Sequence, residues 1–302
     1  MATFTPARLQ AVKQIPSGRG WLYEPKFDGY RGLLATSEAG KGSVWSRNNK
    51  DLGRFFPELV VLAGRLPSAT VLDGEIVMPT ASGVSFTALQ GRLASVGRET
   101  PVAFIAFDLL RNGEDLRRLT LSHRRHSLER IIDGAGDSSL QLVTQTTDRD
   151  EAAAWLDESL SVAGIEGLVA KLDEPYPKPE SRQWKKIRRV STMEFSVCGF
   201  IPEADGSMRL VLAGHDGEQL VVGTTYPVTG VDLKPLERFV ANALQAEHRV
   251  WAPFDDAGRE WFQLPNDSAV IAEVVITTID SGLLRQPARF LRWRSTGTRL
   301  KA

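Results

Sequence analysis

The sequence predicts an α+β protein of two domains, a larger mixed domain over residues 1–190 followed by a smaller β-barrel domain over residues 191–302. Three observations support this prediction. The chain has 302 residues, which is too long for a fold with one small hydrophobic core. Strand and helix patterns alternate along the first part. After the basic cluster KKIRR at residues 185–189, the pattern changes to five strand-like runs with one helix.

In the first domain, runs rich in β-branched and aromatic residues predict strands separated by turns. These runs span residues 20–25, 29–36, 42–47, 69–78 and 102–110. Apolar spacing of helical period predicts helices, which span residues 56–66, 85–93, 121–132 and 148–164. In the last of these, Asp148 suits the N-cap, Glu151 completes a capping-box pattern and Gly164 ends the helix.

In the second domain, five runs predict strands and one run predicts a helix. The strands span residues 194–201, 208–214, 218–226, 269–279 and 288–294. The helix spans residues 234–245, with Pro235 near its start, and falls between the third and fourth strands. This order predicts a five-stranded barrel of the OB type.

The formal charge is zero, with 37 basic and 37 acidic residues, which argues against indiscriminate nucleic-acid binding. The stretch from Leu283 to Ala302 nevertheless carries only basic charges, as does the KKIRR cluster. Solvated charge runs and a contact with a phosphate backbone are both compatible with this pattern. The basic residues of the first stretch are Arg285, Arg289, Arg292, Arg294, Arg299 and Lys301.

The composition excludes several classes of protein. No apolar run is long enough to span a membrane, and the first residues lack the apolar core of a secretory signal, so we expect a cytoplasmic protein without a membrane partner. The single cysteine, Cys198, excludes a disulfide framework and a four-cysteine zinc site. It lies in an alternating apolar segment, which predicts a buried strand cysteine.

Lys26 lies between an extended apolar run and the Asp28-Gly29 turn, with Arg31 five residues further on. A free lysine has a pKa of roughly 10.4 and is protonated at neutral pH. Burial, or a neighbouring cation such as Arg31, would lower that pKa and release the amine lone pair for nucleophilic attack. The alternative interpretation is an edge-strand lysine before an ordinary turn.

Two carboxylates lie in otherwise apolar segments. Glu75 lies inside a predicted strand, and Glu166 and Lys171 bracket another apolar run. A carboxylate in such a segment is costly unless it is paired, hydrogen-bonded or near a metal. Two carboxylates that enter one pocket with lysines predict a hard divalent cation and a polyphosphate. A surface salt bridge is the alternative for each carboxylate taken singly.

Together these segments resemble the covalent nucleotidyltransferase superfamily, and most closely the ATP-dependent DNA ligases. Order and spacing agree across residues 15–190. Residues 26–31 match the KxDGxR nucleophile motif, and the other motif-like segments are SRNN (46–49), DGE (73–75), FIAFDLL (104–110), EGLVAK (166–171) and WKKIR (184–188). The segments FTALQGRL and SHRRHSLERI also look like ligase segments. The resemblance implies a nucleotidyltransferase domain with an ATP-grasp-like mixed sheet, followed by an OB-fold barrel.

By this resemblance, Lys26 attacks the α-phosphate of ATP and forms a lysyl-AMP with release of pyrophosphate. AMP then passes to the 5′-phosphate of a nick, and the 3′-hydroxyl displaces it. The resemblance assigns catalysis to Lys26, Asp28 and Arg31. It assigns nucleotide contacts to Glu24, Pro25, Lys26, Arg31, Arg47, Glu75, Phe107, Lys171, Lys186 and Arg188. It assigns Mg²⁺ or Mn²⁺ to Glu75 and Glu166, and DNA to Arg285, Arg289, Arg292 and Arg294.

Within these sets, Phe107 would stack on adenine and Lys186 would contact the α-phosphate, with Arg188 where the family usually has a second lysine. We expect Trp184 to anchor the segment between the domains rather than to stack on a base. The barrel of such ligases usually ends in an RxDK-like motif that orients pyrophosphate. Here Arg294 remains, but Thr296 and Gly297 stand in place of the acid and the lysine. Self-adenylylation is therefore expected to be slow or to use Arg292.

The expected partners are nicked duplex DNA and DNA end-binding or repair proteins, and we expect the chain to act as a monomer in the bacterial cytoplasm and nucleoid. Its two-domain core is similar to bacterial ligases of the C and D type. Two alternatives remain. One is an RNA ligase or an mRNA capping-type nucleotidyltransferase, and the other is a catalytically weakened homologue that only binds nucleic acid.

Overall fold

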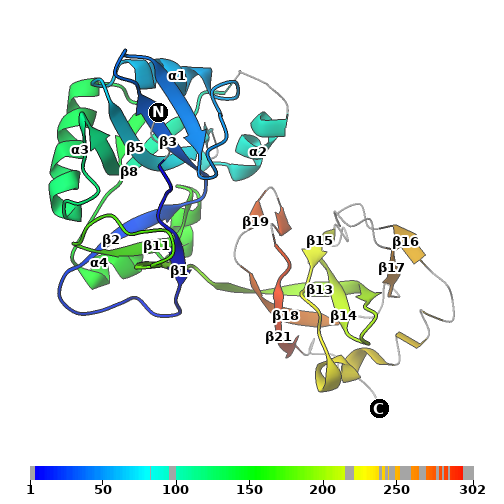
Figure 1. Ribbon diagram of the computed structural model, residues 1–302. Helices are drawn as coiled ribbons and strands as arrows, with labels where there is room; N and C mark the ends of the chain where they lie inside the picture. Colours follow the sequence, from blue (N-terminus) through cyan, green and yellow to red (C-terminus); the bar gives the residue numbers. More distant parts are fainter. Residues whose placement is uncertain are drawn as a thin grey trace. The chain divides into compact units, whose positions relative to one another are not determined.

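The computed structural model describes most of the first part of the chain and selected segments of the second. The described residues are 4–81, 83–94, 100–214, 221–237, 240–241, 244, 249–251, 260–264, 270–276, 279–280, 282–284 and 286–294. The chain divides into two compact units, Met1–Arg189 and Val190–Ala302 (Figure 1).

Two sheets form the centre of the first unit. The four-stranded sheet has the order β1-β12-β11-β2, and its strands are β1 (Leu9–Ala11), β2 (Trp21–Phe27), β11 (Ile165–Leu172) and β12 (Trp184–Arg188). The six-stranded sheet has the order β10-β8-β5-β3-β4, with β9 paired to β8. Its strands are β3 (Tyr30–Thr36), β4 (Gly42–Ser46), β5 (Thr70–Val77), β8 (Ala103–Asn112), β9 (Glu114–Asp115) and β10 (Leu140–Leu142). A short hairpin joins β6 (Pro79–Thr80) to β7 (Gly83–Val84).

Most helices of the first unit lie close to the residue ranges predicted from the sequence. They are α1 (Pro57–Gly64), α2 (Phe86–Ala94), α3 (Leu121–Ala135), α4 (Arg149–Ala154) and the 3-10 helix η1 (Glu158–Ser161). The predicted helix over residues 148–164 is wrong in length. The Asp148 cap is confirmed, because its Oδ1 accepts from the backbone N–H groups of Asp150 and Glu151. A second cap at Asp157, which accepts from Ser159 N, then starts η1, so the chain turns after Ala154.

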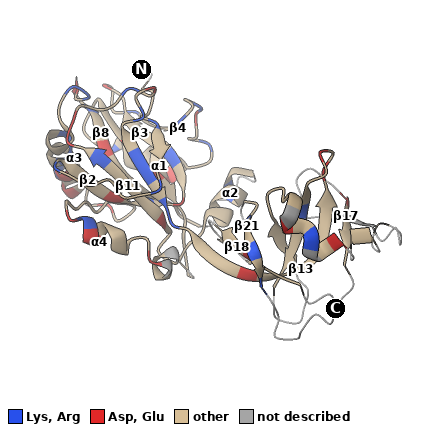
Figure 2. Ribbon diagram, turned by 90° about the horizontal axis from the view of Figure 1, so that it is seen from below, with Lys and Arg blue, Asp and Glu red and all other residues tan. Residues whose placement is uncertain are grey.

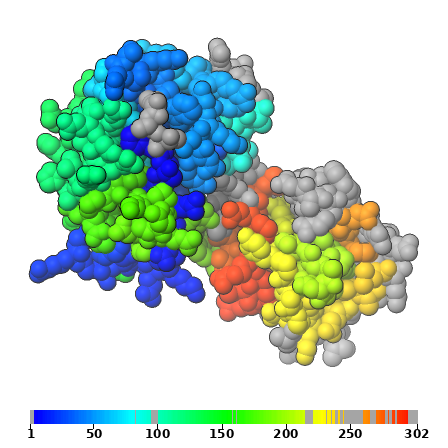
Figure 3. All heavy atoms as spheres, viewed as in Figure 1, coloured from blue at the N-terminus to red at the C-terminus, as the bar shows by residue number. Residues whose placement is uncertain are grey.

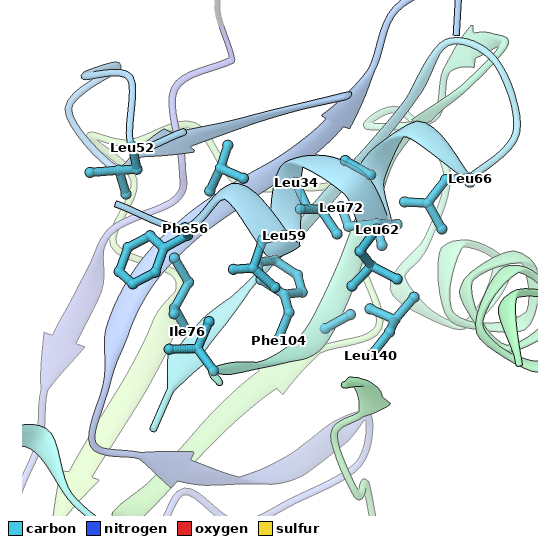
Figure 4. Packing of buried hydrophobic residues seen from close by; sticks show 14 of the residues in the cluster. Leu34, Leu52, Phe56, Leu59, Leu62, Leu66, Leu72, Ile76, Phe104 and Leu140 are labelled. Carbon is cyan, nitrogen blue, oxygen red and sulfur yellow. The ribbon is translucent and has the colours of Figure 1, made fainter. Parts of the chain in front are cut away.

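The main core lies between α1 and the six-stranded sheet (Figure 4). Phe56, just before α1, and Leu59 within it are fully buried against Leu34 of β3 and Leu72 of β5. Burial of each such side chain stabilises the fold by about 1.5–3 kcal/mol. This packing fixes β3 and β5, which carry the predicted site residues Arg31 and Glu75.

One arginine of α3 is a core residue. Arg124 and Asp108 of β8 are completely buried and form two hydrogen bonds, Nε–Oδ1 at 2.7 Å and Nη2–Oδ2 at 2.8 Å. Arg124 also donates to the carbonyls of Leu119 and Glu174. Because a buried charge needs such partners, this pair fixes how α3 meets β8.

The second unit contains a seven-stranded sheet in which β13 pairs with β14, β17 and β18. Its strands are β13 (Ser191–Pro202), β14 (Met208–Ala213), β15 (Val221–Thr224), β16 (Arg249–Trp251), β17 (Glu260–Gln263), β18 (Ile271–Ile276) and β21 (Arg289–Arg294). A separate hairpin joins β19 (Ile279–Asp280) to β20 (Leu283–Leu284). The strands β16 and β17 were not predicted. Within the described residues, the ladders do not close into the predicted barrel.

The predicted helix of the second unit begins as a 3-10 helix, η2 (Gly230–Leu236), and positions 237, 240, 241 and 244 are helical. The core includes Phe200, Leu210 and Val274, all fully buried. Cys198 is buried in β13 as predicted, and burial raises the pKa of its thiol to about 11. No helix in the described part of the chain is long and apolar enough to cross a membrane.

Candidate active site

A pocket lies between the two sheets of the first unit. One wall comes from β1, β2, β11 and β12, and the other from β3, β5, β8 and the segment after β10. In the space-filling view the dark blue N-terminal segment lies against the green segment of this unit, as the pairing of β1 with β12 requires (Figure 3). The pocket is lined by Leu9, Glu24, Pro25, Lys26, Phe27, Arg31, Glu75, Ile105, Phe107, Val143, Val169, Lys171 and Trp184.

Lys26 lies near the end of β2, where its Cα pairs with that of Gly167 on β11. Its Nζ contacts Oε1 of Glu166 as an ion pair, and the two side chains are 17% and 11% exposed. The turn after Lys26 needs glycine, because a Cβ on Gly29 would lie 2.3 Å from the carbonyl oxygen of Ile76. Gly29 thus lets the turn lie against β5, next to Glu75.

Glu75 faces Arg31 across the β3–β5 ladder and lines the same pocket as Lys26. Burial raises the pKa of Glu75 to about 7, although the charges of Lys26 and Arg31 act in the opposite direction. The neighbouring carboxylates Glu166 and Asp73 raise it further. Glu75 and Glu166 therefore interact electrostatically, as two carboxylates that share one site do.

Arg31 lines the pocket, but its polar atoms are engaged by protein groups. Its Nε and Nη2 contact Asp73 at 3.0 and 2.7 Å, and its Nη1 donates to Ala7 O at 2.6 Å. Tyr176 donates from its hydroxyl to Asp73 Oδ2 at 2.6 Å and accepts from Ala7 N at 2.9 Å. The Arg31 guanidinium also lies 5.2 Å from the centroid of the Phe107 ring.

The deep end of the pocket is aromatic, with one buried ion pair. The Phe107 and Trp184 rings meet edge to face at 6.2 Å. Lys171 Nζ lies 4.2 Å from the Trp184 ring centroid and contacts Glu24 Oε2 at 2.6 Å. Lys171 and Glu24 are only 1% and 3% exposed. Trp184, which was expected to anchor the segment between the domains, also lines this pocket.

Three further predicted cations do not line the pocket. Arg47 is exposed in the turn after β4, while Lys186 and Arg188 are half-buried on β12. Burial lowers the pKa of Lys186, and the charges of Arg188, Lys26 and Arg47 act in the same direction. The Nε of Arg188 is buried without a hydrogen-bond partner. These cations act on one another beside Lys26, and together they form a positive site suited to an anion.

The predicted turn residue Asp28 does not line the pocket. Its backbone N–H donates to Gly164 O at 2.8 Å and ties the turn to the start of β11. Pro25 lines the pocket from β2.

A metal would have few protein ligands in this site. Among the described residues, no group of three or more His, Cys, Asp or Glu side chains is arranged to hold a metal ion. The two carboxylates near Lys26, Glu75 and Glu166, nevertheless suit Mg²⁺, because this ion commonly takes one or two carboxylates, water and substrate phosphate oxygens.

Figure 2 marks the basic and acidic positions along the ribbon of the second unit. Two of the predicted DNA-binding arginines of β21 form ion pairs within this unit. Arg292 Nε lies 2.5 Å from Glu273 Oε2. Arg294 Nε lies 2.9 Å from both Glu273 Oε2 and Glu194 Oε1. Arg289 is exposed at the start of the strand, and Arg285, Thr296 and Gly297 lie outside the described residues.

The sequence analysis missed several residues of this site. Leu9 and Val143 line the pocket, Tyr176 holds Arg31 and Asp73, and Gln145 contacts Glu24. None of these residues lies in a segment whose sequence resembles a catalytic or binding motif. The Tyr176 hydroxyl reaches residues more than a hundred positions away, so only the folded chain reveals its role.

Comparison with known proteins identifies the family. Residues 2–188 match the family model of the ATP dependent DNA ligase domain. The chain is 33% identical to DNA ligase C2 of Mycolicibacterium smegmatis, over 96% of this chain and 90% of that protein. It is 32% identical to the multifunctional non-homologous end joining protein LigD of the same organism, over 91% of this chain and 35% of that protein.

A solved structure agrees with these relatives. The structure of a mycobacterial DNA ligase D complexed with ATP and MES is 29% identical, with a TM-score of 0.53, over 96% of this chain and 93% of that one. The matched family residues include the whole pocket, from Leu9 to Trp184. The chain therefore belongs to the ATP-dependent DNA ligase family.

Proposed function

We propose that this chain seals nicks in duplex DNA and that Lys26 is the nucleophile that becomes covalently adenylylated by ATP. The observation that carries the proposal is the position of Lys26, which lies at an aromatic pocket, in contact with one carboxylate and close to a second. An amine in this position can reach a phosphate whose base fills the pocket.

The pocket divides into an apolar part and a charged part. The base would occupy the apolar part, beside Phe107, Trp184 and Val169. Glu24 and Lys171 supply polar atoms there. Aromatic walls with a few fixed polar groups are typical of nucleotide sites. Arg31 and Glu75 would then lie near the ribose.

The phosphates would lie toward the cations of β12. Lys186 and Arg188 are suited to neutralise charge on the α-phosphate, and Arg47 adds a further positive charge. Glu75 and Glu166 would hold Mg²⁺ or Mn²⁺, which when bound polarises the phosphate oxygens. For attack, the Lys26 ammonium must lose a proton, and Glu166 is the carboxylate in contact with it. The nitrogen–phosphorus bond then forms as pyrophosphate leaves.

We assign the second unit to duplex DNA and to the OB type of barrel. An isolated parallel bridge between Thr225 and Ala288 supports the barrel, because it joins the end of β15 to the start of β21. The order of β13, β14 and β15, followed by a helix, also supports it. Arg285, Arg289, Arg292 and Arg294 are the proposed phosphate contacts.

The proposed biological role is DNA repair and end joining in the bacterial cytoplasm and nucleoid, with the chain acting as a monomer that end-binding or repair proteins can recruit. This role is supported by the names of the relatives, which include a DNA ligase and a non-homologous end joining protein. The family match favours this enzyme over an RNA ligase or a capping-type nucleotidyltransferase.

The proposal is tested by incubating the protein with α-labelled ATP and Mg²⁺, followed by a chase with nicked duplex DNA. We expect label on the protein and its discharge onto the nick. Lys26→Ala should remove the label, whereas Lys50→Ala, at an exposed position outside the pocket, should not. Retention of label by Lys26→Ala would refute the assignment of the nucleophile. Failure of the wild-type protein both to take up label and to seal a pre-adenylylated nick would favour the binding homologue.

A further inference from the structure

We infer that Gln145 is a positioning residue that holds the Glu24 carboxylate toward the nucleobase and thereby sets the preference for adenine over guanine. The inference rests on the proposed function, because it requires a purine nucleotide in the pocket between the two sheets. Gln145 carries none of the proposed catalytic roles, and it does not line the pocket itself.

Two donors fix the carboxylate of Glu24, one on each oxygen. Gln145 Nε2 donates to Oε1 at 2.8 Å, and Lys171 Nζ contacts Oε2 at 2.6 Å. Glu24 is 2% exposed, so water does not compete strongly for these oxygens. An ionised carboxylate accepts about four hydrogen bonds, so both oxygens keep acceptor capacity for a ligand.

The backbone around Gln145 fixes the position of its side chain. The next residue, Thr146, forms a two-bond bridge with Tyr23 of β2, with N–O distances of 2.8 and 3.0 Å. On the other side, Val143 N donates to Ala106 O of β8 at 2.9 Å, and Val143 lines the pocket. The segment 143–146 therefore connects the two pocket walls and presents Gln145 to Glu24.

Adenine and guanine differ in the exocyclic group at the 6-position, which is the group that the Glu24 carboxylate would contact. Adenine carries an exocyclic amine at its 6-position, which donates, whereas guanine carries an oxygen there, which only accepts. A carboxylate held in place accepts from the amine and repels the oxygen. Lys171 has the opposite preference, because its ammonium can donate to the guanine oxygen. Without Gln145, only Lys171 of these two donors holds Glu24. The preference of the pocket for adenine over guanine then becomes weaker.

The test compares initial rates of protein labelling from α-labelled ATP and from α-labelled GTP. The variant is Gln145→Met, which keeps the length of the side chain and removes the donor. We expect the ATP-to-GTP rate ratio to fall by roughly tenfold, the change that one hydrogen bond to a charged group supports. Gln141→Ala is the matched control, because Gln141 is an exposed glutamine of β10 that donates to Ser138 O instead.

A ratio that stays within about threefold of the wild-type ratio would overturn the inference, even if both rates fall, because a merely structural role lowers both rates together. If Gln145→Met does not fold, Gln145→Asn carries the same expectation, since its shorter amide does not reach Glu24. Failure of the proposed function has a different signature, because the wild-type protein would then take label from neither nucleotide.

Discussion

Arg31 and Asp73 form a two-bond ion pair across the ladder of β3 and β5, with Nε–Oδ1 at 3.0 Å and Nη2–Oδ2 at 2.7 Å. The Asp73 side chain is fully buried and the Arg31 side chain is 13% exposed. The guanidinium of this pair lies over the Phe107 ring, with its Cζ 5.2 Å from the ring centroid. Arg31 is thus aligned by protein groups alone, which is the preorganisation that the proposed transfer at phosphorus requires.

Tyr176 is predicted to stabilise this alignment. Tyr176→Phe removes a buried hydroxyl that donates to Asp73 and accepts from the backbone of Ala7, so Ala7 N is left without its acceptor. We expect the free energy of unfolding to fall by about 1–3 kcal/mol, as measured by urea denaturation. Tyr226→Phe, at a tyrosine that is 49% exposed, serves as the control. Equal losses in both variants would contradict the prediction.

Ionisation of Glu75 is predicted to lower the stability of the protein as pH rises toward and above neutral. Its pKa in the native protein is about 7, above the ordinary value of 4.5, so the native state holds this proton more tightly than the unfolded chain does. Stability is therefore lost as pH rises from 4.5 through 7. Glu75→Gln, which stays neutral, should melt roughly 2–4 °C higher than the wild type at pH 8.

At pH 5, where Glu75 is protonated in the native protein, this advantage should shrink. Melting temperatures at the two pH values, taken by circular dichroism, provide the measurement. The exposed, ion-paired Glu38 gives the control variant Glu38→Gln. A Glu75→Gln advantage that is the same at pH 5 and pH 8 would argue against a carboxyl with a raised pKa.

Glu273 is predicted to weaken DNA binding, because it neutralises Arg292 and Arg294 on β21. Glu273→Gln should strengthen binding to nicked duplex DNA at low salt. Arg292 loses its partner in this variant, whereas Arg294 keeps its ion pair with Glu194. The slope of log affinity against log salt concentration should become more negative by about 0.9 for each additional phosphate that these arginines neutralise. Fluorescence anisotropy over a salt series measures both quantities.

The matched control is Glu203→Gln, which removes one negative charge from the same unit and releases Arg209 instead. If the two variants change affinity and slope equally, the effect is one of net charge, and the arginines of β21 are not the DNA contacts.

The end of the chain is predicted to limit self-adenylylation. Thr296 and Gly297 stand where the family resemblance leads us to expect an acid and a lysine. The double substitution Thr296→Asp with Gly297→Lys should raise the rate of protein labelling from ATP by roughly tenfold or more, because the added cation stabilises the departing pyrophosphate. Sealing of a pre-adenylylated nick should stay unchanged. A labelling rate that does not rise would refute the assigned role of this segment.

Predictions that rest on local sequence patterns were mostly confirmed, whereas features that depend on contacts between distant residues were missed or wrong. Most strands and helices of the first unit were found near their predicted positions, because apolar alternation and helical spacing are local. The helix over residues 148–164 was wrong, because a second aspartate cap at Asp157 competes with it. The burial of Arg124 was not predicted, because it depends on Asp108, which lies on a different element.

The sequence by itself determined the family and predicted candidate groups for the site, because motifs such as KFDGYR and EGLVAK join a charged side chain to the turn or strand that presents it. The tertiary structure alone decided which groups meet. Lys26 contacts Glu166 across 140 positions, and Gln145 contacts Glu24 across 121. Such contacts depend on strand order and register, which arise from the packing of the whole chain and leave no local signal in the sequence.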